Sequence, residues 1–304
     1  MRTPSLAVIL VNWRNEDRTI PCVAGVKRWT SLKPRVIVVD NQSTSESHRA
    51  LSRVVAPEEL ICSEVNLGYG GGNNLGIARA LSEGQEFILL LNSDAEILEA
   101  GVSALLRRLT DNEDVAILGP VLREGQGADA VRYIGGRDIA RAAATKVVAG
   151  RDALSVVPDF PLHEVDYVSG TVFLARRGVF EQAGLLDEQF FFSGEIANLC
   201  KRARDSGHRA CVDLEVEASH DPGGTPAQLR DTLYTYYSLR NRFHYARKHY
   251  PTEKVRYGLV WTKIGVAAFV RALQQRKPAK ARAIALALAH AHLNRLGNQN
   301  AKFL

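Results

Sequence analysis

The sequence predicts an α/β fold with a Rossmann-like, mostly parallel central sheet flanked by helices. Two runs of β-branched residues, 6–13 and 35–41, each end in polar residues, and residues 16–29 between them have helical spacing. A third extended segment, 60–65, precedes a glycine-rich turn and a helix, and the apolar run from Phe87 predicts a fourth strand. Strands that alternate with helices at this spacing are typical of βαβ units.

Polar residues stand at or just after the ends of all four predicted strands: Asn12, Asp40, Asn66 and Asp94. In open parallel sheets, ligands bind outside the carboxyl ends of the strands. We therefore expect these side chains to meet at one edge of the sheet. Each acid taken alone is equally consistent with a turn, in which Asp and Asn accept hydrogen bonds from the local backbone.

The second half of the chain is less regular at first and then becomes helical. Residues 119–160 are rich in glycine, and 165–177 predict a strand that leads into a helix. Residues 195–209 predict a helix with a glycine stop, followed by a strand. From residue 228 onward the pattern is helical, with breaks at Pro251 and Pro278.

The composition is that of an ordinary globular protein, with 304 residues, of which 46% are hydrophobic and 24% charged. No apolar run reaches the ~18 residues of a membrane span, and the N-terminal run predicts a strand better than a signal peptide. The four cysteines have no CxxC spacing, which favours reduced thiols and a cytoplasmic protein. They are Cys22, Cys62, Cys200 and Cys211.

The net charge of +6 is concentrated at the C-terminal end, because Glu253 is the only acid from Arg240 onward. Such a basic segment attracts phosphates, whether of nucleic acid, lipid headgroups or a pyrophosphate-linked substrate. A solvated helical surface explains the same charges equally well. Nucleic-acid binding is not expected, since the segment contains no recognised module.

Two local patterns allow both a functional and a structural interpretation. Asp94 and Glu96 follow a buried run, which fits a hard-cation site, since Mg²⁺ and Mn²⁺ favour carboxylate oxygens. They fit an exposed turn or a helix cap as well. The glycines of residues 68–74 would let a ligand approach the backbone closely, or would simply form a tight loop. Their spacing is not that of a dinucleotide fingerprint after the first strand.

Seven motifs occur in an order and spacing that resemble one enzyme family. They are VILVNW, VIVVDNQST, NLGYGGGNNLGI, LLLNSDAEI, VDYVSGTVFLARRGVFEQAGLLDEQFF, SGEIANLCKRARDSGHR and YYSLRNR, and they span roughly 6–241. The chain thereby resembles the inverting family 2 glycosyltransferases of the GT-A fold, especially the bacterial rhamnosyltransferase-like branch.

The resemblance implies a set of residues that bind the donor. Asn12 and Asp40 would lie near the nucleotide base and ribose, and Asn66, Gly70 and Asn73 would complete that pocket. Asn92 would lie by the ribose or phosphate, and Ser169, Gly170 and Thr171 would line the sugar pocket. Arg240 would help to stabilise the departing diphosphate.

The resemblance also implies a divalent metal, Mn²⁺ or Mg²⁺. The segment NSD takes the place of the family's D-x-D element, so Asp94 would coordinate the metal, with Glu96 as a secondary candidate. His220 matches a histidine that often completes metal or diphosphate binding, although an isolated histidine is more often structural.

Inverting transfer needs a carboxylate that removes the proton of the acceptor hydroxyl. The family pattern resembles E-D-x-D-L-C-x-R, but here Ile196 and Asn198 replace both aspartates. Glu195 is the one remaining acid of the motif, and we expect it to be the base. The alternative is a capping acid that the helix dipole stabilises. Asn198 keeps the shape of aspartate and loses its charge.

The implied function is metal-dependent transfer of a sugar, rhamnose-like or another hexose, from a UDP- or dTDP-sugar to a bacterial surface glycan or a lipid-linked acceptor. We expect a GT-A domain over 1–226, with a nucleotide-sugar half (1–97) and an acceptor half (98–226). The basic helices of 227–304 would contact the inner face of the plasma membrane or meet a lipid-pyrophosphate acceptor. A non-catalytic sugar-nucleotide-binding protein is an alternative. A nucleotidyltransferase is a weaker one, since NWRNEDRT after the first strand has no glycine.

Overall fold

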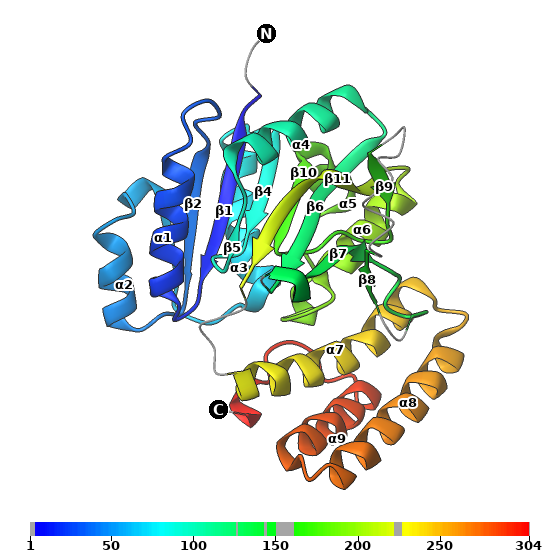
Figure 1. Cartoon of the computed structure of the whole chain (residues 1–304). Helices are drawn as coiled ribbons and strands as arrows, with labels where there is room; N and C mark the ends of the chain where they lie inside the picture. Colours follow the sequence, from blue (N-terminus) through cyan, green and yellow to red (C-terminus); the bar gives the residue numbers. More distant parts are fainter. Residues whose placement is uncertain (1–3, 126, 143–144, 150–160, 222–226, 304) are drawn as a thin grey trace.

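The computed structural model describes residues 4–125, 127–142, 145–149, 161–221 and 227–303 (Figure 1). Four strands run parallel in the spatial order β3 (Leu60–Ser63), β2 (Arg35–Asn41), β1 (Leu6–Asn12) and β4 (Phe87–Leu91). The apolar side chains of β1, β2 and β4 are almost wholly buried on both faces, as parallel strands between two layers of helices require.

Beyond β4 the sheet is mixed. β10 (Val172–Arg176) runs antiparallel between β4 and β6 (Val115–Glu124), and β11 (Arg209–His220) runs parallel to β6. The short β5 (Ala95–Glu96) pairs antiparallel with the end of β11. The remaining strands, which pair with β6 or β11 or with each other, are β7 (Val131–Gly136), β8 (Lys146–Val148) and β9 (Leu162–Glu164). The parallel order predicted from the sequence therefore holds for the first four strands.

Alternate residues of β1 enter two different cores. Leu6, Val8 and Leu10 pack under α1 (Glu16–Lys27), α2 (Ser45–Ser52) and α4 (Glu99–Asp111). Ala7 and Ile9 pack under α3 (Gly68–Ser82), α5 (Arg177–Ala183) and α6 (Glu195–Asp205). Successive side chains of a strand point to opposite faces of the sheet. Both faces are therefore apolar, and helices cover both of them (Figure 1).

The predicted glycine-rich turn is wrong, because Gly70, Gly71 and Gly72 lie inside α3. A Cβ on Gly72 would stand 2.9 Å from Cγ1 of Val11, and one on Gly76 would stand 2.5 Å from Cγ2 of Ile9. The glycines therefore let α3 approach β1 more closely than side chains would allow.

The C-terminal helices are α7 (Ala227–His249), α8 (Lys254–Gln274) and α9 (Pro278–His292), and the helical pattern with its breaks is confirmed. Pro278 stands in the first turn of α9, where its missing N–H costs no helical hydrogen bond. Short 3₁₀ turns complete the described elements: η1 (Pro57–Glu59), η2 (Gly127–Asp129), η3 (Glu188–Phe190) and η4 (Asn300–Lys302). Within the described ranges, no helix is long and apolar enough to cross a bilayer.

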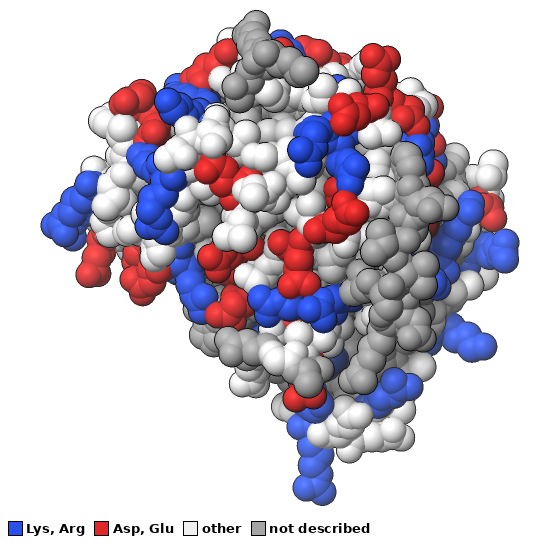
Figure 2. Space-filling view, turned by 45° about the horizontal axis from the view of Figure 1, so that its top comes forward, with Lys and Arg blue, Asp and Glu red and all other residues white. Residues whose placement is uncertain are grey.

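The helical region shares a core with the α/β part. Phe191 packs with Leu233, Tyr236 and Tyr237 of α7 and with Ala283 and Ala287 of α9. The predicted boundary between 226 and 227 adjoins residues 222–226, which lie outside the described residues. On the face drawn in Figure 2, acidic and basic side chains are interleaved over the upper part.

Candidate functional site

The end of β4 forms a tight turn at the edge of the sheet. The backbone N–H of Asn92 donates to the carbonyl of Thr171 on the adjacent chain segment, and the N–H of Ala95 donates back to the carbonyl of Asn92. The N–H of Asp221 donates to the carbonyl of Asp94. This turn brings Asp94 beside the end of β11, because His220 pairs with Ala95 across the β5–β11 ladder.

His220 stands between two carboxylates. Its Nε2 lies 3.5 Å from Oδ2 of Asp94, and its Nδ1 lies 2.9 Å from Oε1 of Glu124 at the end of β6. Burial lowers the pKa of the imidazole, but the hydrogen bonds to Asp94 and Glu124 outweigh that effect and raise it to about 9. His220, with the help of Lys146, in turn lowers the pKa of Glu124 to about 2 despite the burial of that carboxyl.

This arrangement fits a divalent metal held by two protein ligands, Oδ2 of Asp94 and Nε2 of His220. In octahedral geometry, neighbouring ligand atoms lie about 3 Å apart, close to the observed 3.5 Å. Glu124 faces the other ring nitrogen, so it would orient the imidazole for the metal rather than bind the metal itself. The remaining positions would stay open for phosphate oxygens.

Glu96 does not join this group. Its side chain is exposed, and it lies on β5 opposite Ser219. It lines a second hollow, of about 1070 Å³, on the other side of the turn, whereas Asp94 and His220 border both hollows. Sequence reasoning missed Glu124, whose signal is an acid at the end of a strand directly before a glycine.

A cavity of about 760 Å³ opens beside Asp94 and contains part of the predicted donor site. Of the predicted residues, Asn66, Asn92, Asp94, Thr171 and His220 line it. Residues that were not predicted complete the wall: Val11, Trp13, Asn15, Asn41, Lys146, Tyr234 and Tyr237, among others. Their aromatic rings and amides suit a flat base and a ribose, since aromatic faces stack and amides both donate and accept hydrogen bonds.

Four of the five residues predicted for the base and ribose pocket do not line this cavity. Asn12 is fully buried and accepts a hydrogen bond from Oγ1 of Thr19 at 2.7 Å, and Asn73 donates to the carbonyl of Tyr69 within its own helix. Gly70 faces Glu195 instead. Asp40 is 3% exposed; its Oδ2 lies 3.1 Å from Nδ1 of His48, and its Oδ1 has no hydrogen-bond partner in the part of the chain that the structure describes.

A smaller cavity of about 240 Å³ adjoins the first, and the two share Tyr69, Asn92, Lys146, Thr171, Phe192 and Tyr234. Ser169, Gly170, Glu195 and Ile196 line it. The structure therefore brings the predicted sugar-pocket segment and the predicted base into one hollow next to the metal candidate.

Glu195 is the first residue of α6 and is 2% exposed. Burial raises the pKa of its carboxyl to about 8, and its Oε1 has no hydrogen-bond partner among the described residues. Gly70 makes this burial possible, because a Cβ there would stand 3.3 Å from Cγ of Glu195. A carboxyl with a pKa near neutrality is suited to proton transfer.

The predicted contact of Arg240 with the diphosphate is not supported by its geometry. Arg240 is fully buried, and its guanidinium donates to the carbonyls of Gly297 (2.8 Å) and Phe190 (2.8 Å). Asn241 donates to the carbonyls of Phe190, Phe192 and Ser193. Together they hold the loop that leads into Glu195, in which Phe191, Ser193 and Gly194 all have positive φ.

Asn198 also lies away from both cavities. Its Nδ2 is 2.8 Å from Nε2 of His249 on α7, and its Oδ1 accepts from Nε of Arg202. Burial, with Lys201 and Lys248, lowers the pKa of His249 to about 4. A neutral imidazole accepts from an amide, so the asparagine matches its partner, and its role here is structural.

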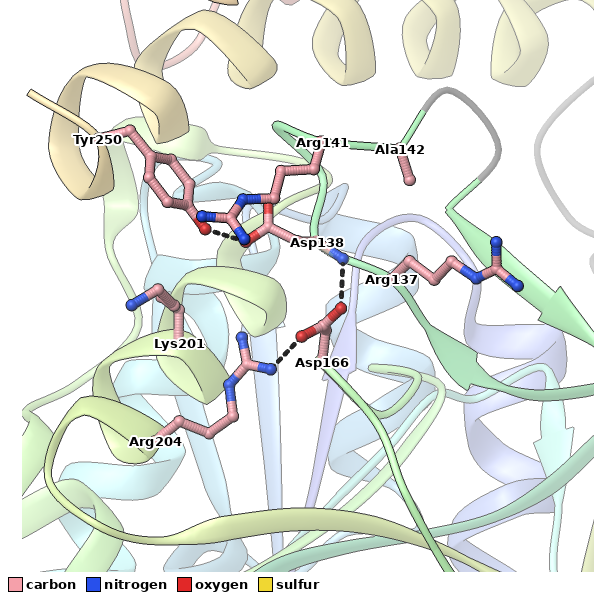
Figure 3. Close-up of a pocket in the computed structure, with 8 residues that line it drawn as sticks. All are labelled: Arg137, Asp138, Arg141, Ala142, Asp166, Lys201, Arg204 and Tyr250. Atoms are coloured by element: carbon pink, nitrogen blue, oxygen red, sulfur yellow. Dashed lines mark hydrogen bonds and ion pairs between the residues drawn. The ribbon is translucent and has the colours of Figure 1, made fainter. Parts of the chain in front are cut away.

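A separate basic pocket of about 480 Å³ contains none of the predicted site residues (Figure 3). Arg137, Arg141, Lys201 and Arg204 line it together with Asp138, Asp166 and Tyr250. Arg204 pairs with Asp166, Lys201 pairs with Asp205, and Arg141 lies over the ring of Tyr250. These contacts largely compensate the positive charge of the pocket.

Comparisons with known proteins bear on the family and the fold of the chain. The family model described as "Glycosyl transferase family 2" matches residues 7–183. A low-salt glycan biosynthesis hexosyltransferase, Agl10 of Haloferax volcanii, is 28% identical over 78% of this chain and 74% of its own. The dTDP-rhamnosyl transferase RfbF of Shigella flexneri is 25% identical over 82% of this chain and 85% of its own.

Solved structures give the fold. The mannosyltransferase PcManGT of Pyrobaculum calidifontis, in complex with GDP-Man and Mn²⁺, superposes with a TM-score of 0.60 at 16% identity, over 99% of this chain and 78% of its own. GalNAc-T7 with UDP, GalNAc and Mn²⁺ gives 0.58 at 13% identity, over 82% of this chain and 55% of its own. The predicted GT-A fold with a helical C-terminal extension is confirmed.

Proposed function

Because the chain belongs to glycosyl transferase family 2, we propose that it is a metal-dependent inverting glycosyltransferase. It moves rhamnose or another hexose from a UDP- or dTDP-sugar to a hydroxyl of a bacterial surface glycan or a lipid-linked acceptor. The observation that carries this proposal is the position of Asp94 and His220, 3.5 Å apart at the mouth of a 760 Å³ cavity. The rhamnosyl and hexosyl transferases among the relatives support the sugar class.

The residues divide the chemistry between the two cavities. In the larger one, Asn66 and Asn92 contact the nucleotide, and Asp94 and His220 hold Mn²⁺ or Mg²⁺. The bound metal supplies positive charge for the departing nucleoside diphosphate. Lys146 lines both cavities and adds a second positive charge there. The presence of Mn²⁺ in the solved structures of GalNAc-T7 and PcManGT supports a metal-dependent reaction.

In the smaller cavity, Glu195 acts as the base. Its carboxylate takes the proton of the acceptor hydroxyl while that oxygen forms a bond with the anomeric carbon, and the bond from that carbon to the diphosphate oxygen breaks. The segment from Ser169 to Thr171 lines the same hollow and orients the sugar. In this proposal the nucleotide half, 1–97, supplies Asn66, Asn92 and Asp94, and the acceptor half, 98–226, supplies Glu195 and also contributes His220 and Lys146 to the donor cavity. The basic region of 227–304 serves a peripheral membrane contact at a cytoplasmic surface.

Ile196 favours a second candidate, a non-catalytic sugar-nucleotide-binding homologue. It places an apolar side chain in the smaller cavity, at a position that the resembling family fills with an acid. Membership of a glycosyl transferase family argues against the alternative of a nucleotidyltransferase.

A donor screen by thermal shift tests the proposal. UDP- and dTDP-sugars are compared with and without Mn²⁺, and the best donor is then followed for turnover by chromatography. We expect one nucleotide to raise the melting temperature only with Mn²⁺ present, and Asp94→Ala to remove that increase. Binding without turnover across the donor panel would identify the non-catalytic homologue, and no metal-dependent binding would refute the metal assignment.

A further inference from the structure

The helix α8 has two apolar faces, of which one is used by the fold. Trp261, Gly265 and Ala272 are buried. The indole N–H of Trp261 donates to the carbonyl of Ala140 at 2.9 Å, and a Cβ on Gly265 would stand 2.8 Å from Cδ2 of Leu288 on α9. This inner face therefore fastens α8 to α9 and to the α/β part, and it accounts for the stability of the helix.

The outer face of α8 carries a second apolar row that no described residue covers. We call it the outer stripe, and its members are 45% to 69% exposed: Val255, Leu259, Val266, Val270 and Leu273. At about 100° per residue, these five positions fall within a sector of about 60° and extend for about 27 Å along the helix. α8 lies at the outside of the helical region, away from the central sheet (Figure 1), and the exposure of these side chains shows that the row faces solvent.

Scattered exposed apolar side chains are ordinary, but five in one row on a single helix are not. An exposed apolar row of this kind marks an interaction surface. The fold does not require these side chains, because the inner face already makes the contacts with α9.

Positive charge lies along one side of the outer stripe. Arg256, Lys263 and Arg271 are exposed on α8 itself. From Lys254 to Leu304 the chain holds ten Lys and Arg and no Asp or Glu, which leaves 29 Lys and Arg against 33 Asp and Glu in the preceding residues. The basic excess of the whole protein therefore lies in the part that contains the stripe.

We propose that the outer stripe of α8 docks the protein on an anionic lipid surface, with α8 lying along that surface. Apolar side chains would enter the boundary between headgroups and acyl chains, and the flanking Lys and Arg would meet anionic headgroups. A second copy of the chain is the other occupant with a matching apolar surface. It fits worse, because two copies would bring the same cations together with no described acid from 254 onward to offset them.

This docking surface rests on the peripheral membrane contact of the proposed function and assigns that contact to one face of α8. Its test does not depend on catalysis. The full chain is sedimented with phosphatidylcholine vesicles that contain or lack phosphatidylglycerol. We expect the chain to bind the anionic vesicles and to bind the neutral ones at least about tenfold more weakly. Donor binding, followed in parallel by thermal shift with UDP, reports on the other site.

Three variants, of which one is a double variant, locate the surface. Leu259→Glu should weaken vesicle binding by about tenfold or more, since one leucine no longer leaves water. Val54→Glu is the matched control, because Val54 is 44% exposed on the α/β part, and it should bind like the wild type. Lys263→Gln combined with Arg271→Gln should reduce the preference for anionic vesicles. All variants should keep their melting temperature and their response to UDP.

Three outcomes would overturn the proposal. The first is a chain that does not sediment with anionic vesicles, and the second is equal vesicle binding by Leu259→Glu and Val54→Glu. The third is a concentration-dependent dimer in sedimentation velocity that Leu259→Glu abolishes, which would assign the stripe to a second copy. Retained vesicle binding in a chain without any transfer activity would contradict the proposed function and leave the docking surface intact.

Discussion

The imidazole of His220 donates its Nδ1 proton to Glu124 across 2.9 Å. The hydrogen bond leaves Nε2 facing Asp94, so Glu124 would decide which ring nitrogen is available to the proposed metal. Asp94, His220 and Glu124 come from three separate segments, which only the sheet brings together.

The first prediction concerns the contact between His220 and Glu124. Glu124→Ala should lower the affinity for Mn²⁺ by about tenfold, because the imidazole loses the group that orients it. Isothermal titration with Mn²⁺ in the presence of UDP measures the change. Glu96→Ala is the control and should leave the affinity unchanged. A larger loss for Glu96→Ala than for Glu124→Ala would return the metal role to Glu96.

The second prediction concerns the base. Glu195→Gln should lower the transfer rate by about a hundredfold or more and keep donor binding. Since burial raises the pKa of Glu195 to about 8, and a base acts in its ionised form, kcat/KM should rise with pH up to about 8 and then level off. A pH profile of initial rates checks this. A rate near that of the wild type in Glu195→Gln would refute the assignment.

The third prediction follows from the same carboxyl but concerns stability. Between its ordinary value of 4.5 and about 8, Glu195 keeps its proton in the folded chain and loses it in the unfolded chain. The free energy of unfolding should therefore fall as the pH rises through that window. Glu195→Gln should flatten this dependence, as urea denaturation at several pH values would show. An unchanged slope in the variant would mean that Glu195 titrates normally.

The fourth prediction concerns Asn198 and His249. In the wild type, the lowered pKa of His249 should make the protein lose stability as the pH falls from 6.5 to about 4, because the unfolded imidazole takes up a proton first. Asn198→Asp places a carboxylate 2.8 Å from Nε2 and should raise this pKa. An NMR titration of His249 measures it, with the exposed Asn294→Asp as control. Transfer activity should not increase, since Asn198 lines neither cavity.

The fifth prediction tests the close approach of α3 to β1. Gly76→Ala should destabilise the protein by about 1–3 kcal/mol, because a Cβ there would stand 2.5 Å from Ile9. Gly258→Ala on α8 meets nothing within 4 Å and should stabilise by about 0.5–1 kcal/mol through helix propensity. Urea denaturation gives both values. Equal stabilisation by the two substitutions would show that a methyl group at position 76 fits between α3 and β1.

The strand and helix pattern was accessible to sequence reasoning because each element depends on short-range periodicity. The runs at β1, β2 and β4 are mainly apolar, and Pro251 and Pro278 stand at the breaks between the C-terminal helices. The glycines of α3 misled the same reasoning. Their local preference is for a turn, and only their neighbours Val11 and Ile9 explain why they lie in a helix.

The site divides in the same way. The family, the four polar strand ends and the position of Asp94 after β4 could be read from the sequence, since they depend on the order of residues along the chain. The folded structure was needed to show that Glu124 and not Glu96 faces His220, that Arg240 holds a loop, and that Asn198 faces α7. Those outcomes depend on where side chains from distant segments point once the core has packed, and that direction is set by contacts that are remote in sequence.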